Sequence, residues 1–308
     1  MSEEQFELHE ELPAFQYNST VRNNGTARRV RDAAVRMFGK KLSRYSRPAE
    51  IEAKHPLCIF VDDGRDDLLD GFPPSPSACY LIDTHLGYTK RLEWARQFDA
   101  VFLAQLPDVD KMKKDGVDNV HWLPLACHPP VDPNADEIRE YLDPSFPTEP
   151  VYDCCFVGFL NDDKEGNSRI DYLDRLIGGE GEFPNSHFAF SKFFEETAKR
   201  YCRAKIGFHI SIRRDLAMRW FECLSYGVPL LTNRTVDGWQ ELGFVDGEHF
   251  IGFTGKDEMI EKAHWILDHP EEAQQVAKEG HEFVREHHTY THRMKHILEV
   301  CGVKNGSS

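Results

Sequence analysis

One stretch of the sequence, residues 205–233, places charged side chains inside the pattern of a ligand-binding fold. Its order is an apolar strand, a charged loop, a helix over about 217–226 that stops at Gly227, and a second apolar strand. This order predicts one βαβ unit of a parallel sheet. Arg219 and Glu222 are three positions apart, so they lie on the same side of that helix. A cation and a carboxylate are therefore expected to project together near the carboxyl edge of the sheet, where such folds bind ligands.

A second interpretation of the same two residues is an ion pair on a solvated helix surface. The spacing assigns one side of the helix to the sheet and another side to polar neighbours: Met218, Phe221, Leu224 and Ser225 on the first, and Arg219, Glu222 and Cys223 on the second. Spacing alone does not choose between a ligand site and a surface pair.

Length and composition predict two domains. A chain of 308 residues that is 40% hydrophobic and 12% aromatic can bury two cores of about 150 residues each. The net charge of −15 argues against a protein that binds nucleic acid over its whole surface.

The cysteine spacing and the lack of a long apolar run indicate the cellular compartment of the protein. Eight cysteines show no C-x-x-C spacing, and neither a signal peptide nor an apolar run of about 18 residues is present. We expect a reduced, cytoplasmic protein without a transmembrane segment.

Residues 1–50 form an N-terminal extension of different composition. Residues 22–47 are rich in arginine and lysine, and an apolar stripe recurs among them at helical spacing: Ala27, Val30, Ala34, Phe38 and Leu42. This pattern predicts a basic amphipathic helix. The helix either packs on its own domain with a solvated basic face, or binds an anionic acceptor, a membrane or a nucleic acid.

Residues 51–128 read as a small array of strands and helices, a first βα domain with a parallel sheet. Polar residues follow two of its strands: Asp62 and Asp63 at the first, and Asp83 and His85 at the next. Asp83 also suits the N-cap of the helix that follows. The proline-rich residues 129–150 are expected to be a linker.

A second βα domain is expected over residues 151–308. Its first strand ends at Gly158, and a helix begins near Arg169. A glycine at that turn lets a ligand approach the backbone, and a helix N-terminus favours a phosphate. The turn lacks G-x-G-x-x-G, so a dinucleotide cofactor is not expected. Fifteen histidines show neither H-E-x-x-H nor a zinc spacing, so no metal site is expected.

Four segments carry a family resemblance. Residues 211–232 spell S-x-R-x-D-x-x-x-R-x-F-E-x-x-x-x-G-x-P-L-L-T, residues 153–158 spell D-C-C-F-V-G, residues 122–126 spell W-L-P-L-A, and residues 287–293 contain H-T-Y-x-x-R. In this order they resemble GT-B glycosyltransferases, specifically the group similar to CgeB spore-maturation proteins. The resemblance implies an α/β fold of two Rossmann-type domains that face a cleft, the N-terminal one small. It also implies that the final helix returns to the first domain.

The resemblance implies a reaction as well: transfer of a sugar from a nucleotide-diphosphate sugar, with a UDP-sugar expected, to an acceptor hydroxyl. No cofactor or metal would be needed, and the anomeric configuration would be retained. The acceptor stays open among a glycan, a protein, a small molecule, or a modified nucleic-acid base reached through residues 22–47.

The resemblance also implies roles for particular residues. Glu222 would hold the ribose hydroxyls, because a carboxylate accepts two hydrogen bonds. Arg219 would neutralise the leaving diphosphate. Donor contacts would also come from Gly158, Arg169 and Gly227, catalytic groups from Asp83 and His85, and secondary contacts from Asp62, Asp63, His288, Tyr290 and Arg293. Related families carry a second Glu where this chain has Arg214.

Two other functions fit the same fold. A nucleotide-sugar epimerase would convert the donor without an acceptor, whereas a non-catalytic module would use the nucleotide-sugar site only to bind a ligand or a partner.

Overall fold

The computed structural model describes residues 57–62, 75–127, 150–160, 169–177, 182–189, 194–211 and 213–303, the backbone of two short strands at 14–17 and 44–45, and positions 29, 30, 33 and 37 of a helix. The chain divides into unit 1, Met1–Pro124 with Tyr290–Ser308, and unit 2, Leu125–Thr289. The last helix is thus grouped with unit 1, as the resemblance implied, although residues 151–308 had been expected to form one domain. The expected linker lies outside the described residues except for Pro150, and Asp63 lies outside them as well.

Unit 1 is a parallel sheet of six strands in the order β2-β1-β3-β4-β5-β6. Its strands are β1 (Ala14–Tyr17), β2 (Arg44–Tyr45), β3 (Cys58–Asp62), β4 (Ser77–Leu81), β5 (Ala100–Leu103) and β6 (Val120–Trp122). Its helices are the short 3-10 turn η2 (Thr84–Leu86), α2 (Tyr88–Ala95), α3 (Leu106–Lys114) and α10 (Tyr290–Val300). The four strands from β3 onward confirm the expected parallel array.

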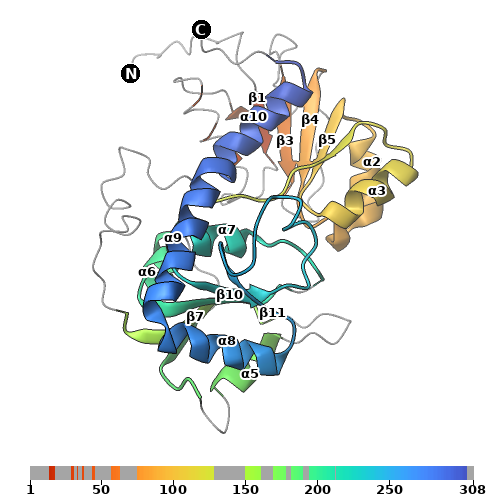
Figure 1. Ribbon diagram of the computed structural model, residues 1–308. Helices are drawn as coiled ribbons and strands as arrows, with labels where there is room; N and C mark the ends of the chain where they lie inside the picture. Colours follow the sequence, from red (N-terminus) through yellow and green to blue (C-terminus); the bar gives the residue numbers. More distant parts are fainter. Residues whose placement is uncertain are drawn as a thin grey trace, which may run out of the picture. The chain divides into compact units, whose positions relative to one another are not determined.

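Helices cover both faces of this sheet. α2 and α3 pack on one face, where Phe60 meets Trp94 and Phe98 in an apolar core. α10 lies along the other face, with His296 6.2 Å from the ring of Phe102 (Figure 1). Strands that are buried on both faces explain the nearly continuous apolar runs of β3, β4 and β5.

The N-terminal extension differs from expectation in two places. Two short strands, β1 and β2, fall where no strand was predicted, because β3 offers β1 an edge for pairing that the local sequence does not reveal. Arg29 was expected on a basic face that is either solvated or binds an acceptor, yet its side chain is buried and its guanidinium lies 5.8 Å from the ring centre of Tyr290. Arg29 therefore contributes to the packing of unit 1.

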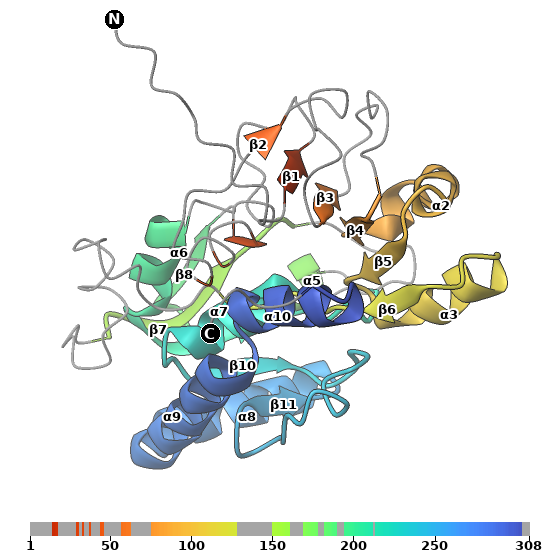
Figure 2. The same cartoon turned by 90° about the horizontal axis from the view of Figure 1, so that it is seen from above.

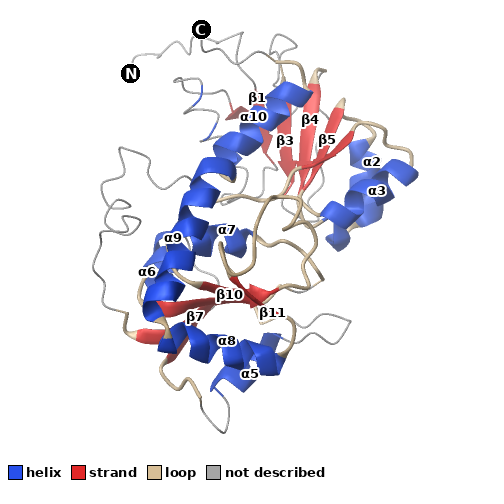
Figure 3. Cartoon of the chain, in the orientation of Figure 1, coloured by secondary structure: helices blue, strands red, loops and turns tan. Residues whose placement is uncertain are grey.

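Unit 2 is a second parallel sheet, of five strands in the order β11-β10-β9-β7-β8. The strands are β7 (Tyr152–Val157), β8 (Ser186–Ala189), β9 (Ala204–His209), β10 (Leu230–Asn233) and β11 (Ile251–Phe253). The helices are α5 (Arg169–Ile177), α6 (Phe194–Tyr201), α7 (Met218–Ser225), α8 (Lys256–Asp268) and α9 (Pro270–His287). The βαβ unit predicted around Gly227 is present as β9, α7 and β10. Figure 3 labels α7 and β10 of this unit.

The two faces of this sheet differ in character. α5 and α8 pack on an apolar core to which Ile206, Phe208 and Ile210 contribute. α6 and α7 pack on the other face, and α9 lies against α7 and α8 (Figure 2). Because side chains alternate along a strand, Gly207 and His209 face α6 and α7. None of the described helices is both long and apolar enough to cross a bilayer.

α9 contains a glycine that its packing requires. A Cβ added at Gly280 would lie 2.2 Å from the carbonyl oxygen of His249 and 2.9 Å from Cδ2 of Leu224. We expect Gly280→Ala to lower the free energy of unfolding by about 1–3 kcal/mol, the usual cost of an overpacked core, although alanine favours a helix. Urea unfolding followed by circular dichroism measures this change.

Gly255 is the matched control, because a Cβ added there meets nothing within 4 Å. Gly255→Ala should cost less than about 1 kcal/mol, since the residue caps α8 and alanine is a poorer cap. A Gly280→Ala protein as stable as the wild type would contradict the close approach of α9.

Candidate functional site

The Arg219–Glu222 pair on α7 is buried. The Nη1 atom of Arg219 lies 2.5 Å from Oε2 of Glu222, and the two side chains are 13% and 6% exposed. Residues 220–225 are all buried, so the expected polar side of the helix is as enclosed as the side that faces the sheet. The reason is that α7 contacts the sheet, α6 and α9. The alternative of a solvated surface pair is therefore wrong.

Arg219 also contacts an aromatic ring. Its guanidinium carbon lies 5.6 Å from the ring centre of Tyr201, a fully buried residue at the end of α6. The hydroxyl of Tyr201 accepts a hydrogen bond of 3.0 Å from the backbone N–H of Val157, the last residue of β7. Burial acts to lower the pKa of Arg219, but the Glu222 carboxylate outweighs it and raises that pKa. The guanidinium thus stays charged beside the carboxyl end of β7.

Arg169 links the loops that follow two neighbouring strands. Its Nε donates to the carbonyl of Ile210, just after β9, at 3.0 Å, and its Nη1 donates to the carbonyl of Phe159, just after β7, at 2.8 Å. Burial and the charge of Arg219 lower the pKa of Arg169. Two cations are thus concentrated at the carboxyl edge of one sheet, with Glu222 as a counter-charge, and this arrangement suits an anionic ligand.

The two candidate glycines both make backbone hydrogen bonds. Gly158 donates its N–H to the carbonyl of Ala189 on β8 at 3.0 Å, so this amide is committed to the sheet. Gly227 has φ of +66°, a left-handed conformation that glycine adopts without strain, and its N–H donates to the carbonyl of Leu224. Gly227 therefore ends α7 as the sequence predicted.

The loop between β9 and α7 is held in an unusual conformation. Arg213 and Arg214 both have φ of +58°, which is uncommon for residues with a side chain. The guanidinium of Arg214 binds the carboxylate of Asp237 through Nε and Nη2, at 3.0 and 2.5 Å. This ion pair holds the loop against Asp237. Arg214 occupies the position where related families carry a glutamate.

Several polar residues at the ends of β9 and β10 were missed by the sequence analysis. The side-chain oxygen of Asn233 accepts from the backbone N–H of Ser211 at 2.8 Å, and its amide nitrogen donates to the Ser211 carbonyl at 3.2 Å. His209 lies 3.0 Å from the hydroxyl of Ser211 and is 4% exposed. A polar residue at the last position of an apolar strand, or just after it, is the signal that could have identified them.

In unit 1, Asp83 and His85 follow β4. Asp83 is in the left-handed region, at φ of +53°, and occupies the N-cap of η2 without a side-chain capping hydrogen bond. The capping alternative therefore does not account for its carboxylate. His85 is exposed, and its neighbour Thr84 donates to a carboxylate oxygen of Asp108. The two candidates share one end of the sheet.

Asp62 lies in the interior of unit 1. Its Oδ2 is 2.7 Å from Nε of Arg91, and the two side chains are 1% and 0% exposed. An ion pair with so little exposure is expected to support the fold of unit 1, where the sequence had suggested a secondary site residue.

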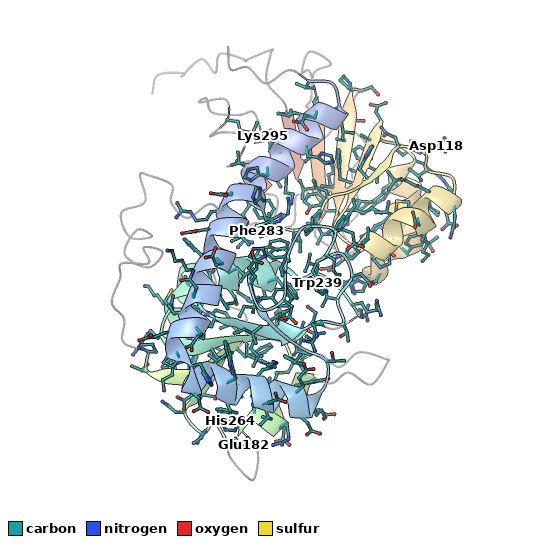
Figure 4. All side chains as sticks on the ribbon, in the orientation of Figure 1. Asp118, Glu182, Trp239, His264, Phe283 and Lys295 are labelled. Atoms are coloured by element: carbon teal, nitrogen blue, oxygen red, sulfur yellow. The ribbon has the colours of Figure 1, made fainter. Side chains whose placement is uncertain are left out.

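The three candidates near the C-terminus also make packing contacts in their own units. His288 Nε2 lies 3.1 Å from the carbonyl oxygen of Leu242, and its ring stacks on that of Phe244. Phe283 of α9, which is labelled in Figure 4, contacts both of these rings. In unit 1, Tyr290 is fully buried, and Arg293 donates from Nε to the carbonyl of Pro124 at 2.8 Å. Of the candidates in unit 2, the structure brings Gly158, Arg169, Arg219 and Glu222 to the carboxyl end of the sheet, whereas Gly227 lies beyond the opposite end of α7 from Arg219.

Comparisons with known proteins identify the class of fold. Residues 168–299 match the family model described as "Glycosyl transferase-like". No curated protein matches the sequence of the chain significantly. The matched segment contains Arg169, Arg219, Glu222 and Gly227.

Solved structures resemble the chain over nearly its whole length. HepE of Anabaena, in complex with UDP and glucose, aligns with a TM-score of 0.61 and 10% identity, covering 94% of this chain and 99% of its own. Sucrose-phosphate synthase of Thermosynechococcus elongatus aligns with a TM-score of 0.56 and 11% identity, covering 94% and 98%. The BGT protein of phage T4, in complex with UDP and Mn²⁺, gives 0.56 and 11%, covering 94% and 99%.

These likenesses confirm the expected fold. The chain has the α/β fold of the GT-B glycosyltransferases, with a Rossmann-like parallel sheet in each unit.

Proposed function

We propose that this protein is a glycosyltransferase that moves a sugar from a nucleotide-diphosphate sugar to an acceptor hydroxyl. The observation that carries the proposal is the buried Arg219–Glu222 pair at the carboxyl end of a parallel sheet, inside the segment that matches a glycosyl transferase-like family. Unlike the buried Asp62–Arg91 pair of unit 1, this pair has a second cation near it, Arg169, at the edge of the sheet where α/β folds bind ligands.

The proposed chemistry follows from the charges. The bond between the anomeric carbon and the β-phosphate oxygen breaks, and the acceptor oxygen forms the new bond. Glu222 accepts hydrogen bonds from the ribose hydroxyls, while Arg219 and Arg169 stabilise the negative charge that develops on the diphosphate. Asp83 or His85 takes the proton of the acceptor hydroxyl. We propose a hexosyl donor carried by UDP, because HepE and BGT hold UDP.

Four finer features belong to the proposal. The reaction retains the anomeric configuration, and the chain is of the CgeB-like group, as its four sequence motifs imply. The protein acts in the cytoplasm, which is supported by its eight free cysteines. The basic residues among 22–47 are proposed to attract an anionic acceptor, with Arg29 excluded because it is buried.

The decisive experiment follows UDP release from UDP-glucose and other UDP-sugars, with and without a panel of acceptor glycans and alcohols. A transferase releases UDP at a rate that depends on the acceptor. Conversion of the donor sugar without UDP release would identify an epimerase, and tight binding without any turnover would identify a binding module.

Metal dependence is tested in the same assay. BGT of phage T4 was solved with Mn²⁺, but Arg219 and Arg169 supply positive charge here without a metal. We expect transfer to proceed at an unchanged rate in excess EDTA. Complete loss of activity, restored by Mn²⁺ or Mg²⁺, would refute metal independence.

A further inference from the structure

His209 has a ring nitrogen that the fold of unit 2 does not use. The residue ends β9, the central strand of the sheet, and is 4% exposed. Its Nε2 lies 3.0 Å from the hydroxyl of Ser211, whereas its buried Nδ1 has no hydrogen-bond partner among the described residues. Buried polar atoms in folded proteins are nearly always paired, so this nitrogen indicates a partner that is not part of the chain.

A second unpaired polar atom lies beside it. Thr232 of β10 is the register partner of His209, is fully buried, and its hydroxyl also has no partner in the described part of the chain. Paired residues on neighbouring parallel strands project from the same face of a sheet. Phe208 points instead into the apolar core of the opposite face. The two polar groups therefore share the face that α6 and α7 cover.

The charges around His209 are positive. Burial, together with Arg169 and Arg219, holds the pKa of His209 well below its ordinary value, so the ring is neutral. Arg169 is also bonded to the carbonyl of Ile210, the next residue in the chain. When the Ser211 hydroxyl donates to Nε2, the ring keeps its hydrogen on Nδ1. A neutral N–H donor beside two guanidinium groups suits an anionic oxygen.

We propose that His209 is a further donor-binding residue, whose Nδ1–H donates to an oxygen of the diphosphate of the nucleotide sugar, with the Thr232 hydroxyl beside it. The inference rests on the proposed function and deepens it. Arg169 and Arg219 supply charge, whereas His209 supplies a directed hydrogen bond from a rigid strand end. The two hydrogen bonds between the Asn233 side chain and the backbone of Ser211 hold this strand end in place.

Two isosteric substitutions test the proposal. The amide nitrogen of His209→Asn occupies the position of Nδ1, whereas the amide of His209→Gln occupies the position of Nε2 beside Ser211. We expect isothermal titration calorimetry to show that His209→Asn binds UDP-glucose nearly as tightly as the wild type. His209→Gln should bind it about tenfold or more weakly, because one hydrogen bond to a charged group is lost. Thermal unfolding of each variant without ligand separates binding from stability.

Equal UDP-glucose affinity of the wild type and both variants would overturn the role of His209 while leaving the proposed function intact. Failure of the wild type to bind any nucleotide sugar would overturn both. If the variants do not fold, ¹⁵N-histidine spectra of the wild type decide. The His209 Nδ1 signal should shift when UDP-glucose is added, and an unchanged signal at saturating ligand would overturn the proposal.

Discussion

Replacement of Arg219 by alanine is expected to lower the rate of sugar transfer by about 10²-fold or more, the effect of losing a donor that stabilises developing charge. Negative charge on the diphosphate grows only as the glycosidic bond breaks, so its partner acts mainly in the transition state. Single-turnover measurements with saturating UDP-sugar report this step directly. Replacement of Glu222 by glutamine should instead weaken UDP binding by roughly 1–3 kcal/mol, because the ribose contact exists before and during the reaction.

The burial of this pair requires a control for stability. Removing one partner of a buried pair leaves the other charge uncompensated and destabilises the fold. Arg219→Lys keeps the positive charge but loses the planar fork, so it should fold better than Arg219→Ala and still transfer sugar slowly. If Arg219→Lys and Glu222→Gln both fold and show rate and affinity within a few-fold of the wild type, the donor site lies elsewhere.

The second large effect concerns Asp62 and Arg91 in unit 1. Both side chains are almost completely buried, and Nε of Arg91 is 2.7 Å from Oδ2 of Asp62. Replacing Arg91 by methionine should lower the free energy of unfolding by about 3–5 kcal/mol, because a carboxylate would remain in the interior without its counter-charge. Chemical denaturation followed by tryptophan fluorescence measures the loss.

Two controls separate charge from packing. The double variant Asp62→Leu with Arg91→Met removes both charges, and we expect it to be markedly more stable than Arg91→Met alone. Lys205→Met breaks a more exposed pair with Asp153, in which Lys205 is 48% exposed, and should cost less than about 1 kcal/mol. A similar cost for Arg91→Met and Lys205→Met would show that Asp62 is solvated or protonated in the folded protein.

The comparison of Asp62 with Asp83 shows why residue type alone did not separate site residues from structural ones. Both were proposed as polar groups at strand ends. Asp62 is paired in the interior with Arg91, which is 29 positions away in the sequence. Asp83 is at the end of β4, in a left-handed conformation. No local pattern distinguishes the two, because the partner of Asp62 comes from a different element.

Patterns over a few residues predicted the order of strands and helices from β3 onward, the stop of α7 at Gly227 and the shared side of Arg219 and Glu222. These features depend on apolar periodicity, glycine conformation and helical spacing over a few residues. Such patterns do not show that the pair is buried, that Arg169 joins the loops after β7 and β9, or that His209 and Thr232 lie side by side. Each of these depends on which strands pair and which helices cover them. Such contacts join residues that are far apart in the chain. They bury the charged groups of the site, and burial strengthens the electrostatic interactions between those groups because the local dielectric constant is lower than in water.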